Sequence, residues 1–237
     1  MGRLDDLVAL VCGGDDHPLA PALRGWAETS RPWLAFAEAH AAKIRKRARL
    51  ASSVGELHDL IAELAVAALF ARDRRFSVVY EPHRASGGRG PDLGVTFRTH
   101  TLFHVEVARL RPSGGDDRTA LRLARVVGDK IGQLPPGAAN LLAVALPPDT
   151  AGDDLIPAAL RMLGRPTGLG ADPASAGVPP EDARAYARGR SRLSAALLCS
   201  LTPTGRPVEV RLWLNPQVRH PLHPEVARFL VQAPAQG

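Results

Sequence analysis

The sequence predicts an α/β protein in which helices flank a mixed β-sheet. Three observations lead to this class. Residues 53–146 carry, in order, the patterns of a helix, three strands, a helix and a strand. The last of these strands, "NLLAVAL", is apolar throughout, which is typical of a strand buried on both faces. At 237 residues, the chain is long enough for one such domain preceded by a helical extension.

Residues 1–52 are predicted to form the helical extension. One short apolar helix and a turn rich in Gly, Asp and Pro come first. A second helix begins at Ser30, an N-cap residue followed by Pro32 in the first turn, and continues through "WLAFAEAHAAKIRKRARL". Lys43 and Lys46 near its end, together with three arginines, suit the helix C-terminus and offer a phosphate-binding patch. The alternative is a solvated helix face.

A longer helix is predicted from Ser53, because Ser53-Val-Gly-Glu56 matches a capping box. Apolar residues at helical spacing predict its buried stripe, which consists of Leu57, Leu60, Ile61, Leu64 and Ala68. Glu63 lies on a neighbouring face of this helix. Since capping occupies Glu56, Glu63 is the free carboxylate of interest.

Three short strands are predicted next. "FSVVYEP" closes on a proline, and after a turn-rich stretch "DLGVTF" and "LFHVEVARL" form a pair joined by "RTHT". Side chains of a strand alternate between two faces, so if Phe103 and Val105 build the core, Glu106 emerges on the opposite face. The same alternation in the preceding strand places Asp92 on the face opposite Leu93, together with Glu106.

The remainder of the chain completes the α/β domain, which is expected to span residues 53–237. Residues 147–192 read as an irregular insertion because they are rich in Pro and Gly. The predicted elements of this part are a helix over 116–134, helical pieces near 153–163 and 180–188, the strands "LSAALLCSL" and "VEVRLWL", and a helix from Pro224.

The chain carries a net charge of +6, and of its 30 basic residues three are lysines and the other 27 arginines. The positive charge makes a polyanion a plausible partner but says nothing of the fold. Cys12 and Cys199 lie far apart in apolar stretches, so we interpret them as core thiols. No stretch resembles a secretion signal or has the roughly 20 apolar residues of a membrane span. A cytoplasmic protein without membrane contact is therefore expected.

Asp92 and Glu106 form the candidate site. Two carboxylates held close on one face of a sheet repel each other unless a cation or a proton compensates their charge. Mg²⁺ is such a cation, since it binds one or two carboxylates and completes its shell with waters and phosphate oxygens. It would activate water for phosphodiester hydrolysis. The alternative is structural: Asp92 caps a turn after Pro91, and Glu106 pairs with an arginine.

The ordered set of these features resembles the PD-(D/E)XK nuclease superfamily. The set comprises an acidic helix, "YEP", "PD" with apolar alternation, "VEV", a helix with "KIGQL", and "NLLAVAL". The resemblance implies a restriction-endonuclease-like central sheet and a nuclease that depends on Mg²⁺ or Mn²⁺ and hydrolyses DNA or RNA. It also implies that Asp92, Glu106 and the carbonyl of Val107 bind the metal.

Three further catalytic candidates follow from the same resemblance. Glu63 corresponds to the helical carboxylate that holds a metal or a water, while Lys130 and Gln133 fall on the helix that lines the site. The chain departs from the family at Ala108, where the family has the lysine that orients the attacking water. Lys130 is the expected substitute, and otherwise a solvated charge at a helix end. His104, on the face of Glu106, is interpreted as a packed histidine.

A basic surface near the site predicts contacts with nucleic acid, with a solvated surface as the alternative. The residues predicted to make these contacts are Lys43, Lys46, Arg109, Arg118, Arg122 and Arg125. The leading hypothesis is therefore a metal-dependent nuclease. Ala108 favours a second hypothesis, a catalytically inactive module that binds nucleic acid or protein and keeps the nuclease fold. A homodimer is left open.

Overall fold

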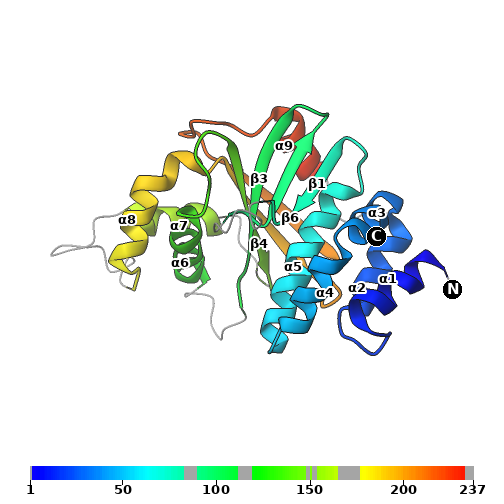
Figure 1. Cartoon of the computed structure of the whole chain (residues 1–237). Helices are drawn as coiled ribbons and strands as arrows, with labels where there is room; N and C mark the ends of the chain where they lie inside the picture. Colours follow the sequence, from blue (N-terminus) through cyan, green and yellow to red (C-terminus); the bar gives the residue numbers. More distant parts are fainter. Residues whose placement is uncertain are drawn as a thin grey trace.

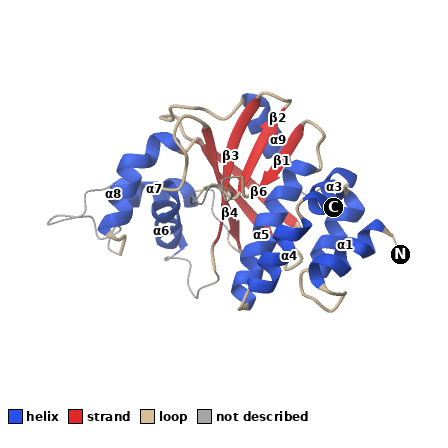
Figure 2. Cartoon of the chain, in the orientation of Figure 1, coloured by secondary structure: helices blue, strands red, loops and turns tan. Residues whose placement is uncertain are grey.

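The computed structural model describes most of the 237 residues. The ranges that it describes are 2–82, 90–111, 119–147, 150, 154–164 and 177–232. Helices flank a central β-sheet in this part of the chain, as the sequence predicts for the α/β class (Figure 2).

The elements follow one another in the order that the sequence patterns predict from residue 53 onward. Their bounds are α1 Arg3–Cys12, α2 Ala20–Thr29, α3 Arg31–Ala39, α4 Ala41–Leu50, α5 Val54–Ala71, β1 Phe76–Tyr80, β2 Leu93–Phe97, β3 Thr101–Arg109, α6 Thr119–Ile131, β4 Ala139–Leu146, α7 Leu155–Gly164, α8 Pro180–Gly189, a 3₁₀ turn Arg190–Arg192, β5 Ala195–Leu201, β6 Pro207–Leu214 and α9 Pro224–Gln232.

The strands form one open six-stranded sheet in sequential order, β1-β2-β3-β4-β5-β6. β1, β2 and β3 are antiparallel neighbours, β3, β4 and β5 run parallel, and β6 returns antiparallel to β5. The sheet is therefore mixed. Because β3 and β4 are parallel, the chain must cross over between them, and α6 makes that crossing.

Helices cover the two faces of the sheet unequally (Figure 1). The N-terminal helices and α5 lie on one side, and α6, α7 and α8 lie on the other. In β3, Phe103, Val105 and Val107 point toward α5 and share its core. In β4, Leu142 and Val144 point to the opposite face and pack with α6. This alternation confirms the face assignment that the sequence predicts for β3, and it makes β4 a strand buried on both faces.

The helical extension contains more breaks than the sequence pattern shows. The Ser30 N-cap is confirmed, since its hydroxyl accepts the amide of Trp33 at 3.2 Å. The single helix predicted after it is wrong, because the chain leaves the helical conformation at His40 (φ −110°, ψ 9°), which separates α3 from α4. The ring of His40 packs between Phe36 and Tyr80, with centroids 4.8 and 6.3 Å away. This tertiary packing outweighs the helical propensity of the continuous pattern.

The extension packs into the same core as the sheet. Trp26 and Trp33 stack with ring centroids 5.4 Å apart, and both belong to the apolar cluster that includes α5 and β3. Helix α2, which the sequence analysis did not predict, supplies Trp26. The indole N–H of Trp26 donates to the carbonyl of Gly205 in the turn between β5 and β6. Residues 1–52 therefore adjoin the α/β part through a continuous hydrophobic core.

Helix α5 begins as predicted and is then buried on nearly all sides. The Ser53 hydroxyl accepts a hydrogen bond from the backbone N–H of Glu56 at 3.2 Å. The Glu56 carboxylate accepts one from the backbone N–H of Ser52 at 2.7 Å, whereas in a standard capping box it would bond to the N–H of Ser53. Every residue from 60 to 71 is buried. Glu63 therefore lies within the protein and not on a polar outer face.

The later elements agree with the sequence prediction, except at the end of α6. This helix ends at Ile131, so Gln133 is not on the helix. It lies in the following turn, and its backbone N–H donates to the Lys130 carbonyl. Both helical pieces of the irregular region, both final strands and the C-terminal helix are confirmed. Cys199 is a buried thiol as expected, and Cys12 is half-buried. In the described part of the chain, no helix is both long and apolar enough to cross a bilayer.

Candidate active site

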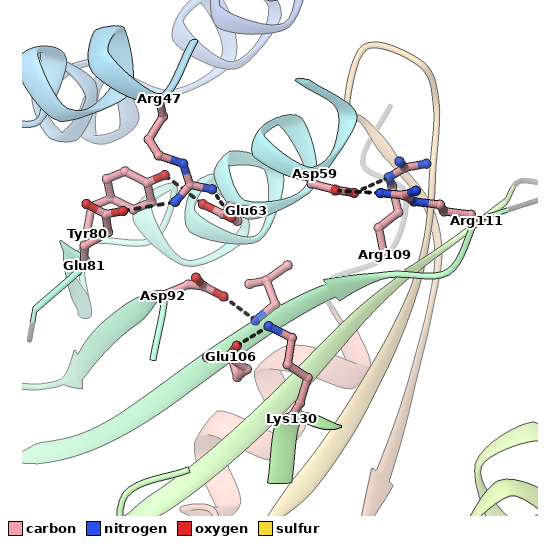
Figure 3. Close-up of polar contacts among 11 residues, drawn as sticks. Arg47, Asp59, Glu63, Tyr80, Glu81, Asp92, Glu106, Arg109, Arg111 and Lys130 are labelled. Atoms are coloured by element: carbon pink, nitrogen blue, oxygen red, sulfur yellow. Dashed lines mark hydrogen bonds and ion pairs between the residues drawn. The ribbon is translucent and has the colours of Figure 1, made fainter. Parts of the chain in front are cut away.

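Asp92 lies at the point where the ladder between β2 and β3 ends. The last paired residues are Leu93 and Val105, so the amide of Val107 has no partner in β2. The Asp92 carboxylate accepts that amide at 2.8 Å through Oδ2 (Figure 3). The amide and carbonyl of one strand residue point to the same side, so the Val107 carbonyl also faces Asp92. Asp92 thus joins the start of β2 to β3.

Glu106 lies next to Asp92 and pairs with a lysine from the crossover helix. It is on the face of β3 opposite Phe103 and Val105, and it is 1 % exposed. The Lys130 ammonium donates to Oε1 of Glu106 at 2.7 Å (Figure 3). Lys130 lies in the last turn of α6, and its side chain is 25 % exposed. The lysine predicted to replace the one absent at Ala108 therefore does reach the predicted carboxylate.

One oxygen of this buried pair has no hydrogen-bond partner. Oε2 of Glu106 is inaccessible to solvent and accepts no hydrogen bond within the described part of the protein. Leaving a buried carboxylate oxygen unsatisfied costs about 1–3 kcal/mol or more, and native structures rarely do so without reason. The atom is therefore one whose lone pairs a proton or a metal ion could satisfy.

The ionisation of both carboxylates reflects their crowding. Burial raises the pKa of Asp92, and the adjacent Glu106 charge raises it further, while the Val107 amide and Lys130 oppose the shift. Burial also raises the pKa of Glu106, against the hydrogen bond and charge of Lys130. Burial alone would lower the pKa of Lys130, but its bond to Glu106 outweighs that effect and raises it. A single ammonium therefore does not offset two neighbouring carboxylates.

Glu63 lies in a second cluster of buried charges beside the first (Figure 3). Its Oε1 accepts a guanidinium N–H of Arg47 at 2.6 Å, and its Oε2 accepts the hydroxyl of Tyr80 at 2.7 Å. The other terminal nitrogen of Arg47 donates to Glu81 at 3.0 Å. Both oxygens of Glu63 thus have donors, so it is not the free carboxylate that the sequence analysis expected. Glu63 is paired because Arg47 of α4 points into the protein and contacts it.

The two clusters influence each other electrostatically. Burial raises the pKa of Glu63, the charge of Asp92 adds to the shift, and Arg47 opposes it. The pKa of Arg47 is raised because the Glu63 carboxylate outweighs the cost of burying the guanidinium. Arg47 also lowers the pKa of Asp92. The carboxylates therefore share one electrostatic environment although they have different partners.

The oxygen donors near Asp92 are of the type that hard divalent cations bind. Within the described residues, no three acidic, histidine or cysteine side chains gather closely enough to form a metal-binding group. Mg²⁺ does not require such a group, because it commonly binds one or two carboxylates and keeps several waters. Asp92, Glu106 with its unsatisfied oxygen, and the Val107 carbonyl supply oxygen ligands of this kind. His104 is buried, in agreement with a packed histidine.

Helices do not cover the whole of the sheet face that carries Glu106. Val79 in β1 and Leu102 in β3 lie on the same face of the sheet as Glu106, as the strand registers show. They are 46 % and 51 % exposed, so α6, α7 and α8 do not cover this end of the face. Asp92 itself is partly accessible. Between the exposed residues and the pair, His104 is buried and Pro82 lies against Gly94, so Asp92 and not Glu106 is the accessible carboxylate.

Several residues predicted to bind nucleic acid have partners inside the protein. The Lys43 ammonium donates to the Tyr80 carbonyl at 2.7 Å, which satisfies an acceptor at the edge of the sheet. Arg109 donates to Asp59 at 2.7 Å and to the Gly55 carbonyl at 3.0 Å, so it ties β3 to α5. Lys46 is exposed, as a phosphate contact requires.

The predicted arginine stripe on α6 also serves internal contacts. Arg125 donates two hydrogen bonds to the Gly177 carbonyl, at 2.9 and 2.7 Å. Arg122 donates to the carbonyl of Arg111. Arg118 lies outside the described residues. The 3.6-residue spacing correctly placed these arginines on one helix surface, but it could not show that neighbouring backbone carbonyls cover part of that surface.

The sequence analysis did not identify Arg47, Tyr80 or Glu81 as members of the site. The quoted "YEP" contained two of them, at the end of β1, and Glu81 has a positive φ of 48°, which is uncommon outside glycine. Arg47 carried no distinguishing signal among the five basic residues of α4. Only its direction, fixed by the break at His40, separates it from the others.

Comparisons with protein-family models, with curated proteins and with solved structures found no match for this chain.

Proposed function

We propose that the protein is a nuclease that uses Mg²⁺ or Mn²⁺ to hydrolyse DNA or RNA phosphodiester bonds, with a restriction-endonuclease-like sheet as its framework. The observation that carries the proposal is the contact between Lys130 and Glu106 beside Asp92. It supports a site in which two acidic residues bind the metal and a lysine lies beside them. This lysine comes from α6, whereas in the nuclease family it comes from the position of Ala108 in β3. The order α5, β1, β2, β3, α6, β4 supports the framework.

Asp92, Glu106 and the Val107 carbonyl would hold the ion. When bound, the ion lowers the pKa of a water ligand and neutralises charge on the phosphate. The protein supplies fixed orientation, since the Val107 amide holds Asp92 and the Lys130 ammonium holds Glu106. Such prior ordering removes part of the reorganisation that the reaction would otherwise require.

Lys130 has a second role in this proposal. An ammonium has three N–H donors, and one of them is directed to Glu106. The Lys130 side chain is 25 % exposed, so the remaining donors would serve a phosphate oxygen on which negative charge increases during the reaction. Removing one such donor from an enzyme typically lowers kcat by about 10²–10³.

The test is cleavage of linear duplex DNA, single-stranded DNA and RNA by the full chain, with Mg²⁺, with Mn²⁺ and with a chelator. We expect metal-dependent shortening of at least one substrate and its loss in Asp92→Asn, which should remain folded because a buried charge is removed. Arg161→Gln, an exposed change on α7, is the control for altered net charge. Cleavage that persists in Asp92→Asn would contradict the assignment.

The second candidate is a module that binds nucleic acid without cutting it, and Ala108 is the feature that favours it. Such a module would retain nucleic acid in a salt-dependent manner, with no shortening of any substrate in Mg²⁺ or Mn²⁺. Asp92→Asn would leave its affinity unchanged or slightly raised, because a negative charge is removed. The same assay therefore separates the two functions.

A further inference from the structure

Four carboxylates lie in or next to the candidate site, in two pairs, and three of them are buried while Asp92 is partly accessible. Asp92 and Glu106 form the first pair, and Glu63 and Glu81 form the second. Nucleases with two metal ions hold them about 3.5–4 Å apart and need carboxylates for both. The second pair supplies the carboxylates that a second ion would need.

The guanidinium of Arg47 occupies the space between the carboxylates of the second pair. One terminal nitrogen is 2.6 Å from Glu63 and the other is 3.0 Å from Glu81 (Figure 3). A planar guanidinium can bridge two carboxylates in this way, whereas an ammonium is a point charge. Tyr80 donates to the remaining oxygen of Glu63. The second pair is therefore already bridged by a cation that belongs to the protein.

The charges of the site favour one divalent ion. The four carboxylates carry four negative charges when ionised, and Arg47 and Lys130 together carry two positive charges. Two negative charges remain, which a single divalent cation neutralises. A second divalent ion would leave two positive charges in excess in a largely buried site, which is costly, whereas without Arg47 two ions would leave an excess of one.

We propose that Arg47 takes the place of a second metal ion, so that each chain binds a single divalent cation at Asp92 and Glu106. This inference rests on the proposed metal-dependent nuclease. It makes the helical extension part of the active centre, because α4 supplies the second positive charge. Glu63 then positions Arg47 and does not bind metal.

The experiment counts Mn²⁺ ions bound to the full chain by equilibrium dialysis, with electron paramagnetic resonance to detect coupled pairs of ions. We expect one ion per wild-type chain, none in Asp92→Asn, and two with a coupled spectrum in Arg47→Met, where Glu63 and Glu81 lose their bridging cation. Arg45→Met, an exposed change on the same helix, should keep one ion. The double variant Arg47→Met with Glu63→Gln should also keep one.

The outcomes separate this inference from the function on which it rests. A wild-type chain that binds no Mn²⁺ overturns the proposed nuclease itself. Two ions in the wild type, or one in Arg47→Met, overturn the role of Arg47 and leave the nuclease standing. If Arg47→Met unfolds, it is refolded in excess Mn²⁺. A chain that stays unfolded there shows that an ion cannot replace the guanidinium, and overturns the inference as well.

Discussion

The two clusters of buried charge differ in how completely their oxygens are satisfied. In the Arg47 cluster, a bridging guanidinium contacts both Glu63 and Glu81, and Tyr80 completes Glu63. In the Lys130 cluster, one ammonium contacts one oxygen of Glu106 and leaves the other buried without a hydrogen bond. Both clusters combine carboxylates with one basic side chain. Saturation of the acceptors distinguishes the structural cluster from the one that can take a ligand.

Removal of Arg47 should have the largest effect on stability. Arg47→Met leaves two buried carboxylates without their cation, and breaking a buried ion pair costs about 3–5 kcal/mol. Unfolding in urea, followed by circular dichroism without divalent cations, measures the loss. Arg45→Met should change stability by no more than about 0.5 kcal/mol, because that side chain is exposed. Equal losses in both variants would mean that the Arg47 bridge contributes little.

Removal of Lys130 should affect activity more than stability. Lys130→Gln keeps a donor but removes the charge, and we expect kcat for metal-dependent cleavage to fall about 10²–10³-fold at saturating metal. KM should change little, since the lysine acts on the charge that develops during reaction. Steady-state kinetics on the best substrate provides the measurement, with Arg161→Gln as the control. A rise in KM at constant kcat would instead assign Lys130 to substrate binding.

The close packing of α6, which carries Lys130, against α8 should not tolerate a side chain at position 128. A Cβ at Gly128 would lie 2.4 Å from the Cβ of Asp182, so Gly128→Ala must separate α6 from α8. Such overpacking typically costs about 1–3 kcal/mol, and the thermal midpoint should fall accordingly. Gly132→Ala is the matched control, because a Cβ there has nothing within 4 Å. If the Gly128→Ala and Gly132→Ala chains were equally stable, α6 and α8 would be able to move apart without loss of stability.

Without a bound metal, the stability of the protein should depend on pH, because the charges of Asp92 and Glu106 are then not balanced. The pKa of Asp92 is raised from 3.8 to about 7, so the folded chain keeps a proton that the unfolded chain has lost. Stability without metal should therefore fall as pH rises from about 4 through about 7, which lowers the thermal midpoint by a few degrees. Asp92→Asn should reduce this slope, and Mg²⁺ should oppose it by binding the ionised form. A midpoint that rises over this range would contradict the assignment.

The local pattern of the sequence was enough to predict most of the architecture. Alternation along β3 identified Phe103 and Val105 as core and put Glu106 on the other face. The all-apolar run identified β4 as buried on both faces. These features could be predicted because strand and helix periods depend on a residue and its near neighbours.

The sequence by itself thus determined the order of the elements from residue 53 onward, the faces of the strands and the two carboxylates, one just before β2 and one in β3. Only the tertiary structure decided that Lys130 meets Glu106, that Arg47 bridges Glu63 and Glu81, and that internal acceptors take up the predicted phosphate contacts of Arg109 and Arg125. The physical reason is that these partners come from elements far apart in the chain. Their meeting depends on how whole helices pack and turn, as at His40, which no local spacing encodes.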